Sequence, residues 1–408
     1  MQNPKTLCML PWVSLETTPL GTTRPCCMAI DEILQPNGEK YDLKEHTLKD
    51  IFQSDYMKDL REQFLKGERP KTCQRCWDEE DAGRTSKRMN TDIRFKHERE
   101  KIDYSNIQPE DIWFLDLKLG NICNLKCRIC GSWSSSKWAA EEIEYHKKEW
   151  KADTKFNIAH TWLKQGRWPR ESDIFWEHME TILPNIRHFE FTGGEPFMIQ
   201  EHFNLLQRAV DLDLAKNIEI HYNTNGTHYP EQHIDLWKQF KYVEIAFSID
   251  NVGKRFELER YGADWEQVQE NIKKFKILRE QNDNIQLQIC MTINAQNVYY
   301  LKDLCDWVSK QNFDYDHFNM LHDPRHMNIG EMTKAAKDLV INRLTQDHFP
   351  PQHRDEIKKI IQFIKNGPTG DGEKFVRLMK KADEFRNESF LETHTPIARA
   401  MGYTDENQ

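Results

Sequence analysis

Three cysteines that lie close together in the sequence, Cys123, Cys127 and Cys130, are the residues of this chain best suited to chemistry. Their spacing, Cys-x3-Cys-x2-Cys, offers three thiolates to a metal centre. A 4Fe–4S cube held by three thiolates keeps open coordination positions on its fourth iron, which suits a cluster that takes part in a reaction. A structural zinc site normally has four protein ligands, and no further cysteine or histidine completes this run locally. The spacing therefore favours a reactive iron–sulfur cluster over a zinc knuckle or unpaired core thiols.

A second motif, Thr192-Gly193-Gly194-Glu195-Pro196, follows an apolar strand-like segment. Together with the three cysteines it resembles the radical S-adenosylmethionine (radical SAM) superfamily. In that family the amino and carboxylate groups of SAM chelate the open iron. An electron from the cluster then cleaves a C–S bond to give a 5′-deoxyadenosyl radical, which abstracts hydrogen from the substrate. The resemblance implies a SAM-dependent enzyme of the oxidoreductase type.

The resemblance also implies which residues contact SAM. The segment that receives the methionine amino group corresponds here to Gly193, Gly194, Glu195 and Pro196. Arg260 matches an arginine that commonly pairs with the methionine carboxylate, a task that suits a bidentate guanidinium. Contacts with the rest of SAM are implied at the ends of later strands, at Asn223, Asn225, Ser248, Asp250, Thr292 and Asn294.

A second group of cysteines lies near the N-terminus: Cys8, Cys26, Cys73 and Cys76. Two short β-type runs flank a turn at residues 19–21, so a hairpin is expected to bring the first two together. A helical stretch over residues 48–66 precedes the last two.

This N-terminal pattern resembles the SPASM/twitch extensions of radical SAM enzymes, which hold auxiliary 4Fe–4S clusters. Four ligands fit the shorter twitch form with one cluster. A zinc ribbon built from the same thiolates is the alternative. Such extensions usually follow the catalytic barrel, whereas this one precedes it. Cys27 adjoins a ligand in sequence and is expected to point away from the metal.

Six strand-like segments alternate with helical segments, which predicts parallel βαβ units. Their number matches the partial (β/α)6 TIM-like barrel that the resemblance implies. The fold class is therefore α/β, with a small N-terminal hairpin-plus-helix iron–sulfur domain and C-terminal helices. The expected domains are 1–100, 110–325 and 326–408. The strands are expected near residues 113–119, 186–192, 217–223, 242–248, 285–292 and 313–320.

Within these strands apolar and polar residues alternate. The apolar face must pack against the helices, so the polar face is expected to line the barrel. About half of the charged residues there are expected to pair with one another, because unpaired buried charge is costly. Cys290 lies on this inward face. It is a candidate hydrogen donor to a substrate radical, but the interpretation we favour is an inert, small core residue, because free cysteines are often simply buried.

An insertion at about residues 131–180 is longer than a simple crossover helix requires. One interpretation makes it a cap that recognises substrate through aromatic surface. The other, which we favour for most of its aromatic residues, is a helical pair packed against the barrel. It carries six tryptophans: Trp133, Trp138, Trp150, Trp162, Trp168 and Trp176.

The overall composition excludes several classes of function. The net charge of −9 argues against broad nucleic-acid binding. No apolar run reaches the roughly 18 residues that span a bilayer, and the N-terminus lacks a signal-peptide pattern, so a cytoplasmic protein is expected. The ten cysteines fall in metal-ligand spacings, which indicates reduced thiolates and not disulfides.

The substrate is left open by the sequence. A peptide or protein substrate is favoured by the wide helical periphery, and a small polar metabolite such as a sugar or nucleotide is the alternative. A flavodoxin- or ferredoxin-type reductant is implied by the resemblance. The alternative outside catalysis is an inactive metal-binding scaffold.

Overall fold

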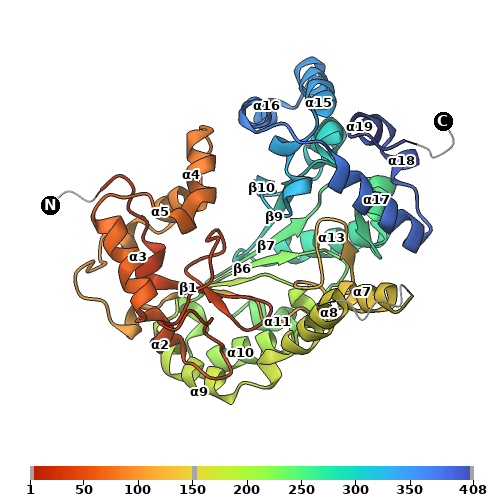
Figure 1. Ribbon diagram of the computed structural model, residues 1–408. Helices are drawn as coiled ribbons and strands as arrows, with labels where there is room; N and C mark the ends of the chain where they lie inside the picture. The colour runs from red at the N-terminus through yellow and green to blue at the C-terminus, as the bar shows by residue number, and fades with distance from the viewer. Residues whose placement is uncertain (1–3, 149–153, 405–408) are drawn as a thin grey trace.

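An eight-stranded sheet forms the centre of the molecule in the computed structural model, which describes residues 4–148 and 154–404 (Figure 1). The strands lie in the order β10-β9-β7-β6-β5-β3-β1-β2. Two short strands, β4 (Lys126–Cys127) and β8 (Arg260–Tyr261), form a separate antiparallel pair. The strands of the main sheet are β1 (Ser14–Thr17), β2 (Thr23–Arg24), β3 (Phe114–Leu117), β5 (His188–Phe191), β6 (Glu219–Thr224), β7 (Tyr242–Ser248), β9 (Ile285–Ile293) and β10 (Tyr315–Met320).

The six strands predicted from the alternation, β3, β5, β6, β7, β9 and β10, are all present and pair in parallel. Parallel neighbours need crossover connections, and helices provide them. The α/β class and the partial barrel are thus confirmed.

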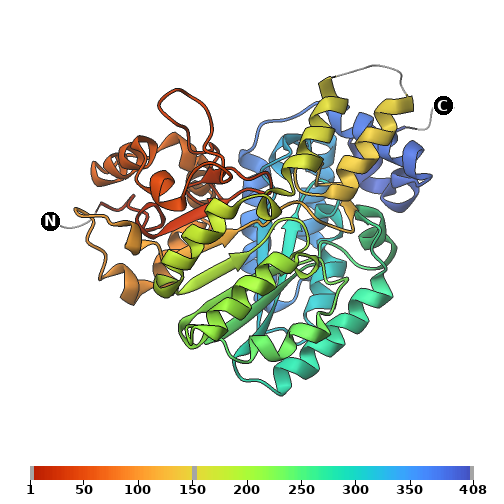
Figure 2. The same cartoon turned by 90° about the horizontal axis from the view of Figure 1, so that it is seen from below.

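The apolar face of each strand is buried against these helices, as predicted. Phe189 and Phe191 of β5, and Ile220 and Tyr222 of β6, are 0–1% exposed. Figure 2 shows the helices packed along the outside of the strands. They are α10 (Gln200–Asp211), α11 (Ile234–Trp237), α12 (Gly253–Glu259), α13 (Trp265–Glu280) and α14 (Leu301–Val308).

The N-terminal segment forms the predicted hairpin, because β1 and β2 pair antiparallel. The predicted helix at 48–66 is broken near Ser54, which caps the second of two helices. The helices of this segment are α1 (Leu10–Val13), α2 (Leu48–Phe52), α3 (Asp55–Leu65), α4 (Gln74–Asp81), α5 (Lys87–Arg94) and α6 (Lys96–Arg99).

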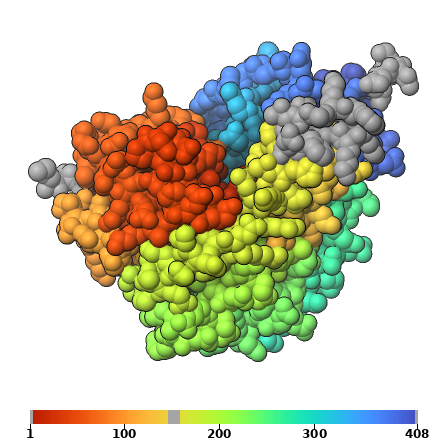
Figure 3. All heavy atoms as spheres, turned by 60° about the horizontal axis from the view of Figure 1, so that its bottom comes forward, coloured from red at the N-terminus to blue at the C-terminus, as the bar shows by residue number. Residues whose placement is uncertain are grey.

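The hairpin also joins the barrel sheet, which the sequence did not predict. β1 pairs in parallel with β3, with Leu15 opposite Leu115. This pairing satisfies the backbone groups of an edge strand that would otherwise stand open. The N-terminal segment is therefore an extension of the same sheet, and Figure 3 shows its residues (red and orange) directly against the yellow-green segment beside them. One contact there is the Ser172 hydroxyl, which donates to the Leu43 carbonyl at 2.6 Å.

Helices α4 and α5 and the loop between them also reach the far edge of the sheet. Arg84 donates to the carbonyl of Phe318 in β10 at 2.6 Å, and Arg75 pairs with Asp323 at 2.6 Å. The N-terminal segment thus contacts both ends of the open barrel.

The insertion contains α7 (Ser136–Lys148), α8 (Thr154–Gln165) and α9 (Asp173–Ile182). Trp168 is fully buried, and the indole of Trp176 donates to the Pro169 carbonyl at 2.6 Å. Trp133 is 42% exposed and packs edge-on against Trp162. Trp150 lies outside the described residues.

The C-terminal segment is helical, as predicted. Proline and glycine residues at 350–351 and 367–372 separate its helices, as expected for residues that cannot continue a helix. Among the residues described, no helix has the length and apolar character to cross a membrane. These helices are α15 (Lys334–Gln346), α16 (Arg354–Asn366), α17 (Glu373–Arg386), α18 (Phe390–Thr393) and α19 (Thr395–Ala400).

Candidate active site

The loop that carries Cys123, Cys127 and Cys130 follows β3 at the carboxyl end of the sheet. The first two are 9% and 6% exposed, and the third is half-buried. The indole of Trp138 donates to the Cys127 carbonyl at 2.7 Å, so one of the insertion's tryptophans supports this loop directly. Burial raises the pKa of the Cys123 thiol to about 12, a penalty that metal coordination removes because the bound form is the thiolate.

Arg260 is held beside this loop by the β4–β8 pair, in which Cys127 and Arg260 are direct partners. One guanidinium nitrogen lies 3.9 Å from the Cys127 sulfur, and another donates to Asp250 at 2.5 Å. The Arg260 Nε is buried and has no partner among the described residues. The guanidinium therefore keeps donor capacity for an anionic group close to the cysteines.

The Gly193-Gly194-Glu195 segment packs against the same loop. Both glycines have positive φ, and a Cβ on Gly194 would lie 2.5 Å from the Ile122 carbonyl oxygen. Glu195 donates its backbone N–H to that carbonyl at 2.8 Å. Only glycine fits this close approach in the left-handed region.

The Glu195 carboxylate is fully buried and bonded within the fold. It accepts from the Thr224 hydroxyl and the Asn225 amide, both at 2.7 Å, and from the Phe197 amide at 3.2 Å. Burial raises its pKa to about 7, although these hydrogen bonds lower it in part. The side chain thus joins the loop after β5 to the loop after β6.

The other residues predicted to contact SAM are divided between the lumen and the loop turns. Asn225 Nδ2 lies 4.0 Å from the Cys123 sulfur. Asp250 accepts from the Thr292 amide at 2.9 Å, which ties two strand ends together. Asn294 is 1% exposed, and its side-chain oxygen accepts from the Gln296 amide at 2.9 Å, so it stabilises a turn. Asn223 and Ser248 are half-buried at the ends of β6 and β7, and Pro196 begins a 3-10 turn.

The four N-terminal cysteines, Cys8, Cys26, Cys73 and Cys76, line one small cavity. Burial, followed by the charges of the other three, raises the pKa of Cys8 well above its ordinary value. Burial raises the pKa of Cys26 to about 12. A set of thiols this close together and this poorly solvated is expected to be occupied by metal as thiolates.

The spacing of the thiols favours a polynuclear cluster over zinc at both places. A single zinc ion, with Zn–S bonds of about 2.3 Å, holds its sulfurs about 3.8 Å apart. Within residues 4–148 and 154–404, only Cys27, Asp116 and Glu190 bring three possible ligand atoms within 4.8 Å of one another. Neither cysteine group is that tight, so the residues present fit iron–sulfur clusters.

The lumen between the two cysteine groups is lined by paired charges, as expected. Lys118 bridges Glu16 and Asp116, and Lys87 of α5 pairs with Glu190. Lower in the barrel, the Arg94 guanidinium from the same helix contacts two carboxylates, those of Glu219 and Glu244, at 3.3 Å each. The side chains of α5 thus neutralise the acidic residues of β5, β6 and β7.

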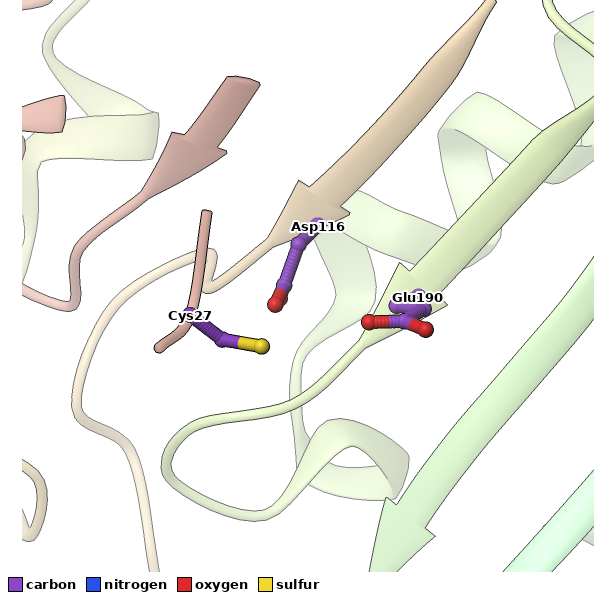
Figure 4. A group of neighbouring side chains, drawn as sticks. All are labelled: Cys27, Asp116 and Glu190. Atoms are coloured by element: carbon purple, nitrogen blue, oxygen red, sulfur yellow. The ribbon is translucent and has the colours of Figure 1, made fainter. Parts of the chain in front are cut away.

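Two cysteines face this lumen. Cys290 of β9, the predicted candidate, lies opposite Ser248 of β7. Burial, and then the nearby Asp250, raises the pKa of its thiol to about 12. Cys27 points away from the four-thiol cavity, as expected, but toward Asp116 and Glu190 (Figure 4). Sequence reasoning set Cys27 aside because it adjoins a cluster ligand, and nothing in the sequence indicated that it lies near these two carboxylates.

Two family models match this chain, one over each group of cysteines. Residues 117–285 match the model of the radical SAM superfamily, and residues 8–77 match the SPASM model of an iron–sulfur cluster-binding domain. The search of curated proteins finds no match.

The solved structures that match part of this chain include native anSMEcpe with bound AdoMet, at 18% identity and a TM-score of 0.35. That match covers 55% of this chain and 58% of the other. Streptococcus suis SuiB bound to precursor peptide SuiA is 16% identical with a TM-score of 0.31, covering 50% of this chain and 38% of the other. The chain thus spans less than two thirds of either protein.

Proposed function

We propose that this chain is a radical SAM enzyme that abstracts hydrogen from a peptide or protein substrate, because residues 117–285 match the radical SAM superfamily model and residues 8–77 match the model of an iron–sulfur cluster-binding domain. The radical SAM domain implies a 4Fe–4S cluster and SAM, and the SPASM domain implies auxiliary iron–sulfur chemistry. The observation that carries the proposal is the convergence of three thiols, Arg260 and the Gly193-Gly194-Glu195 segment at one end of the barrel.

Cys123, Cys127 and Cys130 would hold the SAM-binding cluster, which when bound supplies the electron that cleaves SAM reductively. Arg260 binds the methionine carboxylate through its unpartnered donors, while Asp250 fixes the guanidinium in place. The backbone at Gly193 and Gly194 approaches the methionine amino group. The Glu195 carboxylate holds this segment against the loop after β6 through its hydrogen bonds with Thr224 and Asn225.

Cys8, Cys26, Cys73 and Cys76 would hold the auxiliary cluster. The hairpin that carries Cys8 and Cys26 lies at the β1 side of the barrel sheet, while the residues proposed to bind SAM follow β5 to β9. A substrate bound in the lumen would therefore lie between the two cysteine groups. This arrangement supports an auxiliary cluster that exchanges electrons with the substrate or binds it.

A peptide is favoured as the substrate by the surface beside the cysteine loop. Trp133, three residues after Cys130, is exposed and packs against Trp162 of the insertion. An exposed tryptophan supported by a second aromatic ring is suited to binding an extended chain. The SuiB structure contains a precursor peptide, and one of anSMEcpe contains a peptide with AdoMet.

The proposal is tested by anaerobic purification, iron and sulfide analysis, and dithionite-driven conversion of SAM to 5′-deoxyadenosine. We expect about eight irons per chain and 5′-deoxyadenosine formation, since two 4Fe–4S clusters are expected. No cleavage of SAM by the iron-loaded protein would overturn the proposed activity and leave a metal-binding scaffold.

The substrate class is tested separately by the rate of 5′-deoxyadenosine formation. A mixture of synthetic peptides should raise this rate above its substrate-free value. Stimulation by a mixture of sugars and nucleosides, and not by the peptides, would assign a small polar metabolite instead.

A further inference from the structure

Cys27 belongs to a compact group in the lumen that the proposed ligand sets do not use. Its sulfur, one oxygen of Asp116 and one oxygen of Glu190 lie within 4.8 Å of one another (Figure 4). The three residues come from the hairpin segment, β3 and β5. Cys27 is half-buried as a residue, and its sulfur points toward the two carboxylates (Figure 4).

Two lysines argue against a cation at this group. Lys87 pairs with Glu190, and Lys118 lies 3.2 Å from Asp116. These ammonium groups already balance the carboxylates, and a metal ion would have to displace both. The group is therefore better suited to a neutral or polar part of a substrate.

A buried acceptor without a partner points to such a substrate. Asp116 is 3% exposed, and among the described residues its Oδ2 has no hydrogen-bond partner. Its other oxygen accepts from the Thr192 hydroxyl at 3.0 Å, and Thr192 directly precedes Gly193. An unpaired buried carboxylate oxygen is costly unless a bound molecule supplies a donor. The group thus adjoins the segment assigned to SAM and has an acceptor left for a ligand.

We propose that the Cys27 thiol is the hydrogen-atom donor that ends the reaction, which makes the net change in the substrate redox-neutral. This inference rests on the proposed function. The 5′-deoxyadenosyl radical takes a hydrogen atom from a substrate carbon, and the Cys27 S–H bond breaks as a new C–H bond forms at that carbon. Cys27 is left as a thiyl radical.

The thiyl radical is returned to the thiol by one electron and one proton. An auxiliary cluster held in part by Cys26, the chain neighbour of Cys27, would supply the electron, and the Asp116 carboxyl group passes the proton from solvent to the sulfur. Each turnover then uses two electrons from the external one-electron reductant and one proton. It converts SAM to methionine and 5′-deoxyadenosine.

Cys290 is less suited to this role, although it also faces the lumen. It lies near Asp250 and Arg260, on the side assigned to SAM. Cys27 lies on the side of β1 and β3, so it can reach a substrate carbon from a direction different from that of the adenosyl radical. Cys27 and Cys290 therefore lie on different sides of the lumen, and substituting each in turn distinguishes which thiol is the hydrogen donor.

The first test uses the cluster-loaded protein in D2O with SAM, dithionite and the synthetic peptides that stimulate 5′-deoxyadenosine formation, without added thiol. Exchange gives Cys27 an S–D bond, so donation from this thiol to the substrate radical yields a peptide with a carbon-bound deuterium. Water does not contribute, because its O–H bonds are too strong to donate a hydrogen atom. The quantity compared is carbon-bound deuterium in the peptide per 5′-deoxyadenosine formed, which corrects for the number of turnovers.

We expect label from the unmodified protein and loss of label in Cys27→Ala and Cys27→Ser. Cys290→Ala should keep it, as should Cys305→Ala, a matched control at a fully buried cysteine on α14. Unchanged label in the Cys27 variants, loss of label in Cys290→Ala, or no label in the unmodified protein would each overturn the inference. Absence of any 5′-deoxyadenosine would instead remove the proposed function, and this inference with it. Iron content equal to that of the unmodified protein verifies that the variants fold.

The second test does not depend on turnover. Iodoacetamide is added to the cluster-loaded protein under anaerobic conditions, and alkylated cysteines are identified by peptide mapping. We expect the seven proposed ligands to be protected and Cys27 to react ahead of Cys305. Protection of Cys27 with alkylation of Cys26 would make Cys27 a cluster ligand and overturn the inference.

Discussion

Arg128, which lies in the loop between the second and third cysteines, donates a hydrogen bond of 2.5 Å to Asp383 in α17, 255 residues further along the chain. The Arg128 side chain is 1% exposed and also contacts Glu388 at 3.0 Å. Arg386 of the same helix pairs with Glu141 and lies 4.6 Å from the ring of Trp138, which in turn supports Cys127. The C-terminal helices therefore hold the loop of three cysteines from outside.

Asp383→Ala should destabilise the protein and loosen this loop. It leaves the buried Arg128 guanidinium without its closest partner, which typically costs about 3–5 kcal/mol. We expect a lower urea midpoint and incomplete iron loading. Asp355→Asn is the matched control, because Asp355 pairs with Lys358 on the exposed surface of α16 and should change little. Equal midpoints for the two variants would contradict the positioning role of α17.

Substitutions in the two cysteine groups should have different effects. Cys127→Ala should lose about four irons and all SAM cleavage, because it removes a ligand of the reactive cluster. Cys8→Ala should also lose about four irons but keep SAM cleavage without substrate. Iron analysis and 5′-deoxyadenosine formation are measured together. Full iron content in Cys8→Ala would show that the N-terminal thiols do not hold a cluster.

Arg260→Lys should weaken SAM binding. A lysine keeps the charge but loses the planar fork that serves Asp250 and a carboxylate together, and a lost charge-assisted pair costs roughly 1.5–3 kcal/mol, or about 10–100-fold in Kd. Equilibrium dialysis of SAM against the cluster-loaded protein measures this. Arg255→Lys is the control, since Arg255 pairs with Asp303 outside the site. Equal affinities in the two variants would exclude Arg260 as the carboxylate partner.

Glu195 should make stability depend on pH. Its folded-state pKa of about 7 lies above the unfolded value of 4.5, so the folded state binds the proton more tightly. The free energy of unfolding should therefore fall as pH rises from 4.5 through 7, by an amount on the order of 3 kcal/mol. Glu195→Gln removes this ionisation. Urea unfolding at pH 5.5 and 8 should show a smaller difference in the variant, and an equal difference would contradict the shift.

The barrel and its polar lumen could be predicted because they depend on local order in the sequence. Alternation in segments such as residues 285–293 assigns each side chain to a face without reference to the rest of the chain. The sequence predicted that charged residues of the lumen pair with one another, but not which residues pair. Partners such as Lys87 and Glu190 are 103 residues apart in the chain. The cysteine groups were found because their spacing is itself the signal.

Other features could not be predicted, because they depend on contacts between distant segments. The pairing of β1 with β3 joins residues about 100 positions apart, and no periodicity indicates it. The position of Cys27 beside Asp116 follows from that pairing. Asn294 was assigned to SAM from its place after a strand, but its bonds to Gln296 and Asn297 also suit an ordinary turn.

The β1–β3 pairing has a consequence for how the chain folds. During synthesis the hairpin and its four thiols emerge before β3, and Lys87 and Arg94 of α5 emerge before the carboxylates of β5, β6 and β7 that neutralise them. Pairing across this separation is slow, because the intervening chain must lose entropy before the contacts form. Until β3 and β5 to β7 are made, the N-terminal segment has an unpaired strand and unpaired cations. We therefore expect it to reach its final structure only together with the barrel, so that the two fold as one cooperative unit and not as separate modules.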